Sequence, residues 1–261
     1  MSVDPSDRTP DPTRVPADDA VQDELNILVP RRRPIQERSR RKFQALLSSA
    51  REVLVEVGFD SFTCEEVASR AGVPIGTLYQ FFANKYVLVC ELDRQDAHGV
   101  IEEVERFAQK IPALDWPELL NDFLDHLADL WLRDPSRRAV WLATQATPAT
   151  RATAAVNERE IARMIASVLA PLMPATERER RAFMAEVLVH VAYSMLNFSV
   201  STGNATSASA GAGTIAAGTV AGGTVSAGSA VGEDIHDATV TELKRMLTAY
   251  LWLAEKEAQA G

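Results

Sequence analysis

Apolar residues recur with the period of an α-helix along most of this chain. From Glu37 onward they follow one another at spacings of three and four residues, and Gly58 ends the run. A glycine there can adopt the left-handed conformation that closes a helix C-terminus. We find no alternating segment bounded by hairpin turns, so the sequence predicts an all-α protein. The apolar positions of this first helix are Phe43, Leu46, Leu47, Ala50, Val53, Leu54 and Val57.

Polar and turn-forming residues mark the starts of the next helices. Thr63 followed by Glu66 is a capping-box pattern, in which the threonine hydroxyl accepts a hydrogen bond from the third helical N–H. Gly72 ends that short helix, and Pro74 opens the next because its fixed φ suits a first turn. Asn84 is a favourable N-cap for a long fourth helix. Further helical segments are expected near residues 115–131, 134–142, 150–172, 176–198 and 233–258.

Two segments lack this apolar pattern. Residues 1–35 are rich in Pro, Asp and Arg and cannot bury enough surface to offset the entropy of ordering, so a disordered arm is expected. Residues 201–232 hold eight of the 13 glycines and no charged residue. This composition predicts a flexible linker between the last two helices.

The net charge of -9 by itself disfavours nucleic acid as a partner, but the charges are unevenly distributed along the chain. Residues 1–28 carry seven acids and two bases, whereas residues 31–42 carry seven bases and one acid. Such a reversal indicates a basic contact surface beside an acidic tail.

Several classes of protein are disfavoured. Cys64 and Cys90 form no CxxC pattern and have no Cys/His cluster around them, so neither a disulfide framework nor a metal site is expected. Catalytic patterns such as HExxH are missing, and the glycine-rich residues 211–218 follow no strand, so we expect no enzyme and no cofactor. The N-terminus has no signal-peptide pattern, and the apolar runs are too short for a membrane span. A soluble, cytoplasmic protein is expected.

Residues 63–80 match a helix-turn-helix, with a capped short helix, a glycine turn and a second short helix. In that motif the second helix enters the major groove of DNA, and its N-terminal residues approach base edges. The small residues Gly76 and Thr77 let the backbone come close to the groove wall. Ile75 or the Thr77 methyl group can contact a thymine methyl, and Gln80 can form paired hydrogen bonds with adenine.

Neighbouring polar residues suit the DNA backbone. The Tyr79 hydroxyl and the Lys85 ammonium are candidate phosphate contacts, but a tyrosine here also fits a core and a lysine an exposed helix start. Arg40 and Arg41 either contact DNA or form a solvated helix face. The three arginines at 31–33 either reach the minor groove as a flexible arm or form a solvated tail. The other large residues of the motif are assigned to the core: Leu78, Phe81 and Phe82.

Residues of about 38–88 resemble the DNA-binding domain of TetR-family transcriptional regulators. The matching pattern is a basic start to the first helix, G-F near its end, T-x-x-E-V-A-x-x-A-G-V, and then G-T-L-Y-x-x-F-x-x-K. The resemblance makes Thr63, Tyr79 and Lys85 phosphate contacts and puts Ile75, Gly76, Thr77 and Gln80 on the groove face. Pro74 departs from the family, which often has Ser there. The DNA-binding candidates are Arg40, Arg41, Thr63, Pro74, Ile75, Gly76, Thr77, Tyr79, Gln80 and Lys85.

The resemblance also implies a DNA-binding domain at 36–83 and a larger helical domain at 84–261. The larger domain is expected to bind a small effector and to form a homodimer through helices near 177–200 and 234–256. Bulky and polar residues at helical spacing can line a pocket for an apolar or aromatic ligand, although each also fits a core. The expected function is a repressor that an effector releases from a pseudo-palindromic operator; an activator or a helical adaptor is the alternative. The effector-site candidates are Phe123, His126, Leu127, Trp131, Trp141, Gln145, Met164, Tyr193 and Asn197.

Overall fold

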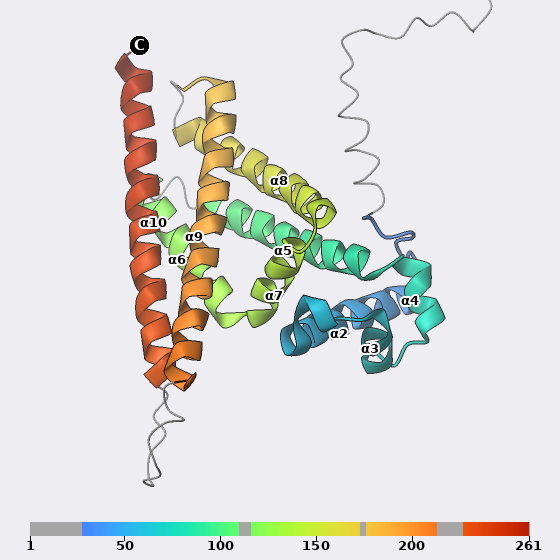
Figure 1. Ribbon diagram of the computed structural model, residues 1–261. Coiled ribbons are helices and arrows are strands. Elements are labelled where there is room, and N and C mark those ends of the chain that lie inside the picture. Colours follow the sequence, from blue (N-terminus) through green and yellow to red (C-terminus); the bar gives the residue numbers. More distant parts are fainter. Residues whose placement is uncertain (1–27, 110–115, 173–175, 213–226, 261) are drawn as a thin grey trace, which may run out of the picture.

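The computed structural model describes residues 28–109, 116–172, 176–212 and 227–260, and every regular element in these ranges is an α-helix (Figure 1). The prediction of an all-α protein is therefore confirmed. The helices form a small group, α2 to α4, beside a larger bundle, α6 to α10, and α5 connects the two. Their bounds are α2 Glu37–Ser61, α3 Cys64–Arg70, α4 Ile75–Phe81, α5 Lys85–Ala108, α6 Trp116–Arg133, α7 Pro135–Thr144, α8 Pro148–Leu172, α9 Arg178–Ala212 and α10 Ala227–Ala260.

Side-chain caps fix the helix starts that the sequence predicts in the small group. The Thr63 hydroxyl accepts from the Glu66 N–H at 3.3 Å, and the Asn84 side chain accepts from the Val87 N–H at 3.0 Å. Pro74 is the N-cap residue of α4 and makes no side-chain cap. Gly58 has a φ of 68° and interrupts the end of α2 as expected. Thr176 followed by Glu179 has the same capping-box pattern and predicts a cap for α9, but the buried Thr176 hydroxyl has no hydrogen-bond partner among the described residues.

Three phenylalanines form the centre of the small group. Phe43 of α2 stacks on Phe82 at 5.0 Å between ring centroids and meets the edge of Phe81 at 5.3 Å. Phe81, Phe82 and Leu78 are at most 1% exposed, which confirms their assignment to the core. These contacts fix the inner face of α4 in the core and leave its outer face exposed to solvent.

The long helix α5 belongs to two cores at once. Its first turns, with Val87, Leu88 and Leu92, are buried in the cluster formed by α2 to α4, which also takes in residues of α7. Its later turns, with Val100 and Val104, are buried among α6, α8 and α9. The expected boundary at 83/84 coincides with the start of α5, but the packing of the small group extends past it.

The last two helices lie side by side along one edge of the bundle (Figure 1). Between Arg178 and Ser199, α9 has the length and the mean hydropathy of 1.2 that a membrane span needs, contrary to the expectation for the apolar runs. Its buried residues Met184, Leu188 and Leu196 pack within the bundle. The hydropathy of this stretch therefore also fits a helix at the centre of a helical bundle.

Two segments expected to be irregular are partly ordered. Leu28 is 5% exposed and packs in the core of the small group, so the segment from residue 28 to 35 is held in place; residues 1–27 lie outside the described residues. Residues 201–212 continue α9, and residues 227–232 belong to α10. Alanine favours the helix, and extending an existing helix avoids the cost of nucleation. The central part of the expected linker, 213–226, lies outside the described residues.

Candidate nucleic-acid interface and effector cavity

The first turns of α4 present a small, open face. Pro74, Gly76 and Gln80 are exposed, Ile75 is 38% exposed, and Thr77 is half-buried. In the part of the chain that the structure describes, a Cβ built on Gly76 would have no heavy atom within 4 Å apart from its chain neighbours and the backbone of its own helix, so this face has room for a close partner. The four residues expected at the groove, Ile75, Gly76, Thr77 and Gln80, therefore lie together on the outer side of a helix whose inner side is fixed by Leu78 and Phe81.

The Tyr79 side chain lies at the surface, and its hydroxyl is hydrogen-bonded to an acidic residue. Its side chain is 37% exposed, and its hydroxyl donates to Glu65 Oε1 of α3 at 3.1 Å. This hydrogen bond raises the pKa of the Tyr79 phenol. Of the two alternatives for Tyr79, the structure therefore favours the surface position over the core position. A phosphate at this hydroxyl would meet the Glu65 carboxylate as a competitor.

The Lys85 ammonium binds groups within its own domain, whereas the sequence predicts that it contacts a phosphate. Its ammonium lies 4.5 Å from the centroid of the Phe59 ring and donates to the carbonyls of Phe59 at 3.0 Å and Phe62 at 3.3 Å. These carbonyls lie at the end of α2, where backbone acceptors lack helical partners. The side chain thus closes the end of α2, a role that the linear sequence does not reveal.

The basic residues before the motif divide into two groups. Arg31 donates from its backbone N–H to the Phe81 carbonyl at 2.8 Å and from Nη1 to the Tyr79 carbonyl at 3.1 Å, which caps the end of α4. Arg33 donates to the buried Glu91 at 3.2 Å. These contacts differ from the hypothesis that residues 31–33 act as a flexible arm. Arg40 and Arg41 are exposed on α2.

An apolar cavity of about 100 Å³ lies inside the larger bundle. It is enclosed by α5, α6, α8, α9 and α10, and of the expected effector residues Phe123, Leu127 and Tyr193 line it. The sequence does not predict the remaining lining residues, because aliphatic residues on five helices have the same helical spacing at a cavity as in a filled core. The missed residues include Val100, Val104, Leu119, Leu120, Ile165, Leu188, Ala192, Leu247 and Leu251.

A second space of about 30 Å³, which we call the polar lobe, adjoins this cavity. Val100, Ile161 and Tyr193 line both. Trp131 and Trp141, expected effector residues, border only the polar lobe among the cavities described. Its polar lining comprises Asp93, Asp96, Arg137, Asn157 and Glu158.

The other expected effector residues do not line either space. His126 Nε2 lies 2.9 Å from Glu103 Oε2, and its ring lies 5.6 Å from that of Phe107. Gln145 donates to the Thr144 hydroxyl at 3.2 Å. Met164 packs against the core of the bundle, and Asn197 lines neither space.

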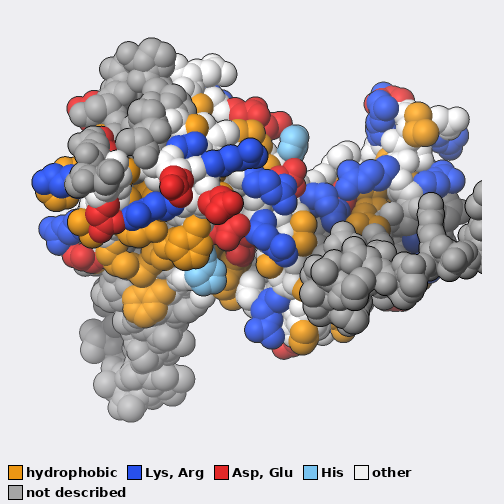
Figure 2. Space-filling model, turned by 90° about the horizontal axis from the view of Figure 1, so that it is seen from above, with side chains coloured by type: hydrophobic (Ala, Val, Ile, Leu, Met, Phe, Trp, Pro, Cys, Tyr) orange, Lys and Arg blue, Asp and Glu red, His pale blue; other side chains and the backbone are white. Residues whose placement is uncertain are grey.

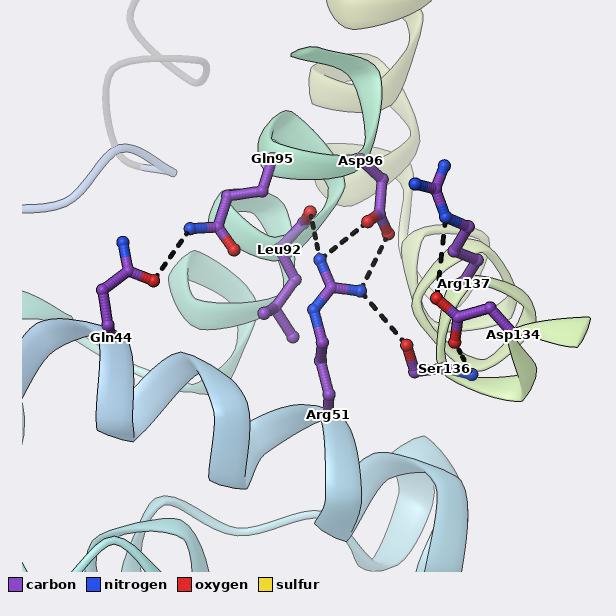
Figure 3. Close-up of polar contacts among 8 residues, drawn as sticks. All are labelled: Gln44, Arg51, Leu92, Gln95, Asp96, Asp134, Ser136 and Arg137. Carbon is purple, nitrogen blue, oxygen red and sulfur yellow. Dashed lines mark hydrogen bonds and ion pairs between the residues drawn. The ribbon is translucent and has the colours of Figure 1, made fainter. Parts of the chain in front are cut away.

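A guanidinium joins the small group to the wall of the polar lobe (Figure 3). Arg51 of α2 donates to both carboxylate oxygens of Asp96, at 2.7 and 3.1 Å, and to the Leu92 carbonyl at 3.4 Å. It also reaches the Ser136 hydroxyl of α7 at 3.4 Å. One side chain therefore connects α2, α5 and α7 at a carboxylate that also lines the lobe.

Comparison with known proteins identifies the family. The model for bacterial regulatory proteins of the tetR family matches residues 46–92, and the model for the tetracyclin repressor-like C-terminal domain matches residues 114–208. Together the two matches cover more than half of the chain. The chain belongs to the TetR family. The DNA-binding transcriptional regulator expected from the sequence is thereby confirmed.

A relative among known proteins is a transcriptional regulator of the HTH type. The HTH-type transcriptional regulator YdeS of Bacillus subtilis is 28% identical over 87 residues, which are 33% of this chain and 39% of YdeS. The chain thus matches about two fifths of the length of that relative.

Two solved structures have a similar fold. A TetR-family regulator from Streptomyces coelicolor has a TM-score of 0.54 at 18% identity, over 82% of this chain and 99% of that one. FadR from Bacillus subtilis, in complex with stearoyl-CoA, has a TM-score of 0.52 at 16% identity, over 76% of this chain and 97% of that one. At these identities the likeness concerns the TetR fold.

The contact of Glu65 with Tyr79 gives a first prediction for DNA binding. Glu65→Gln removes a negative charge from the DNA-facing motif, so we expect DNA affinity to rise several-fold and the difference to shrink at high salt. Fluorescence anisotropy with a labelled duplex at several salt concentrations measures both effects. Glu160→Gln, at an exposed site on α8, is the control and should match the wild type. Equal affinity of Glu65→Gln and wild type would mean that Glu65 does not face DNA.

The enclosed carboxylate of Asp93 gives a prediction for stability. Burial raises the pKa of Asp93 to about 6, even though Asn157 donates to it at 2.5 Å. Because the folded pKa exceeds the unfolded one, the ionised group costs stability above pH 6, and the cost vanishes as the pH falls below about 4.

Asp93→Asn should therefore be more stable than the wild type by about 3 kcal/mol at pH 8 and about equally stable near pH 4. Urea unfolding of both proteins across this range tests the difference, with the exposed Asp122→Asn as the control. A difference that does not change with pH would contradict the assignment.

Proposed function

We propose that this TetR-family regulator is a cytoplasmic repressor that binds a pseudo-palindromic operator as a homodimer and leaves it when an effector occupies the bundle. The observation that carries the proposal is the connection of two sites by α5. The same helix is buried beneath the exposed face of α4 and also lines the apolar cavity. A ligand that favours one position of α5 therefore alters the DNA-reading face, provided that it binds the two states with different affinity.

In this proposal α4 is the recognition helix. Ile75, Gly76, Thr77 and Gln80 meet base edges, while Tyr79 and the exposed Arg40 and Arg41 meet phosphates. The support is the shared outer face of these α4 residues and the burial of their neighbours Leu78 and Phe81. Thr63 and Lys85 have structural tasks here, since Thr63 caps α3 and Lys85 closes α2.

The dimer contact is proposed for α9 and α10. Both helices expose large apolar side chains at the edge of the bundle: Phe183 at 63%, Phe198 at 58%, Met246 at 51%, Trp252 at 52% and Leu253 at 54%. Figure 2 shows orange side chains gathered on the part of the molecule that contains these helices. Exposed apolar groups of this kind suit a protein partner. One short recognition helix reads few base pairs, so a second copy supplies the other half-site.

A link between the two functions is proposed at Arg51. The Arg51 guanidinium binds the Asp96 carboxylate and so connects α2 to α5 next to the polar lobe. Its contact with the Ser136 hydroxyl connects α7 to the same point (Figure 3). A change at Asp96 would act directly on α2, because Arg51 of α2 binds this carboxylate. α2 also carries part of the core beneath the recognition helix. Both partners are about four-fifths buried, with side chains 22% and 19% exposed, so solvent screens the pair less than a surface pair.

A shift assay with a palindrome from the protein's own promoter region, paired with sedimentation, tests the proposal. Trp252→Asp puts a charge into the proposed dimer contact, so we expect monomers and a loss of operator affinity of about tenfold or more. Leu142→Asp is the matched control, because Leu142 on α7 is 50% exposed and lies outside the proposed contact. A monomeric wild type, or binding that shows no sequence preference, would refute the proposal.

A further inference from the structure

The polar lobe combines carboxylates with aromatic rings. Asp93, Asp96 and Glu158 lie in its wall together with Trp131, Trp141 and Tyr193. The Trp131 ring lies 6.1 Å from Trp141 and 5.8 Å from Tyr193, both in edge-to-face arrangement. Faces of aromatic rings attract cations, most strongly in desolvated sites, and carboxylates add charge of the opposite sign. This combination favours a positively charged group.

The charges of the lobe remain unbalanced after the internal pairs are assigned. Asp96 is paired with Arg51, and Arg137 lies 3.6 Å from Asp134, so neither base neutralises the other acids. Asp93 has an amide partner in Asn157, and Arg94 beside it is held by Glu91. Glu158 makes no hydrogen bond or ion pair in the described part of the chain, and burial raises its pKa, with His190 acting in the opposite direction.

One enclosed polar atom of the lobe also lacks a partner. The indole Nε1 of Trp141 is buried and has no hydrogen-bond acceptor among the described residues. The Tyr193 hydroxyl makes none of the hydrogen bonds found there, and burial raises the pKa of its phenol. Tyr193 lines both spaces. The unpartnered indole N–H is a hydrogen-bond donor, so only an acceptor can satisfy it, and the attraction of the lobe for a cation comes from its acids and aromatic rings.

A metal ion does not explain the lobe. Among residues 28–109, 116–172, 176–212 and 227–260, no three His, Cys, Asp or Glu side chains are arranged to hold one. The size of the lobe is also informative. A space of about 30 Å³ holds one or two groups of the size of water, which is the size of an ammonium group. The adjoining cavity of about 100 Å³ suits a short alkyl chain or part of a ring.

From this lining we infer that the effector is an apolar primary amine, with its ammonium group in the polar lobe and its hydrocarbon part in the apolar cavity. The inference rests on the proposed function and names the chemistry of its effector. Asp93 and Glu158 supply the negative charge, and Trp131, Trp141 and Tyr193 supply the aromatic faces. The ammonium also lies beside Asp96, where it competes with Arg51 for the carboxylate. The ligand thereby weakens the connection between α2 and α5.

Hexylamine, hexan-1-ol and hexanoate share one chain and differ in the head group, so they separate recognition of charge from burial of apolar surface. Calorimetric titration of the full-length protein should give tightest binding for hexylamine, by about tenfold or more over hexanol and further over hexanoate. Asp93→Asn and Glu158→Gln should each weaken the binding of hexylamine by about tenfold while hexanol binding stays unchanged. Glu160→Gln, two residues away on the exposed side of α8, should bind hexylamine as the wild type does.

Equal binding of hexylamine and hexanol, or tighter binding of hexanoate or stearoyl-CoA, would overturn the inference. So would hexylamine binding that survives both substitutions in proteins whose circular dichroism shows a folded state. Operator binding is measured in the same preparations. Hexylamine should lower operator affinity in the wild type but not in Asp93→Asn, and an operator affinity that hexylamine leaves unchanged would overturn its role as effector. Failure to bind any operator without ligand would instead count against the proposed function.

Discussion

The continuous helix α5 is the constraint on which the rest of the molecule depends. Its early turns are buried with the three-helix DNA-binding group, and its later turns are buried in the bundle that encloses the cavity. Packed interiors resist gradual deformation, so a shift at one end of such a helix cannot be absorbed locally. The Asn84 cap fixes the point where the helix begins, directly after α4. Its middle carries Asp93 and Asp96, between the two cores.

The acidic groups at the middle of α5 are costly to bury, and they lie where the proposed coupling would act. Asp96 is satisfied by Arg51, whose planar fork matches a carboxylate and holds α2 against the bundle. Asp93 has no such partner, and its raised pKa records the cost of enclosing it. Sites that bind ligands often retain groups of this kind at the expense of stability. The position of these two acids, one turn apart, relates the proposed ligand site to the attachment of the DNA-binding domain.

Local signals in the sequence predicted much of the fold. Thr63, Asn84 and Asp134 cap the helices that follow them, because a side-chain cap acts within three residues of itself. The exposed positions of α4 were likewise predictable, since the period of the helix separates them from Leu78 and Phe81. The family motif added the identity of the domain.

Contacts between distant residues could not be read in the same way. Lys85 looks like a surface lysine until the fold brings the end of α2 to it, and Tyr79 meets Glu65 only because α3 and α4 pack together. Most of the effector candidates are aromatic or polar residues, whereas the cavity is lined mainly by aliphatic residues from five helices. An aliphatic residue at a cavity has the same helical spacing as one in a filled core, so the sequence does not separate them.

Filling the cavity without any ligand tests the coupling most directly. Ala192 is buried on α9 and lines the apolar cavity, and a tryptophan there exceeds the available space, so the surrounding helices must move. Operator affinity and unfolding free energy of Ala192→Trp are measured in the same preparation. We expect a folded dimer with operator affinity lowered by about tenfold. A folded Ala192→Trp dimer with wild-type operator affinity would contradict it.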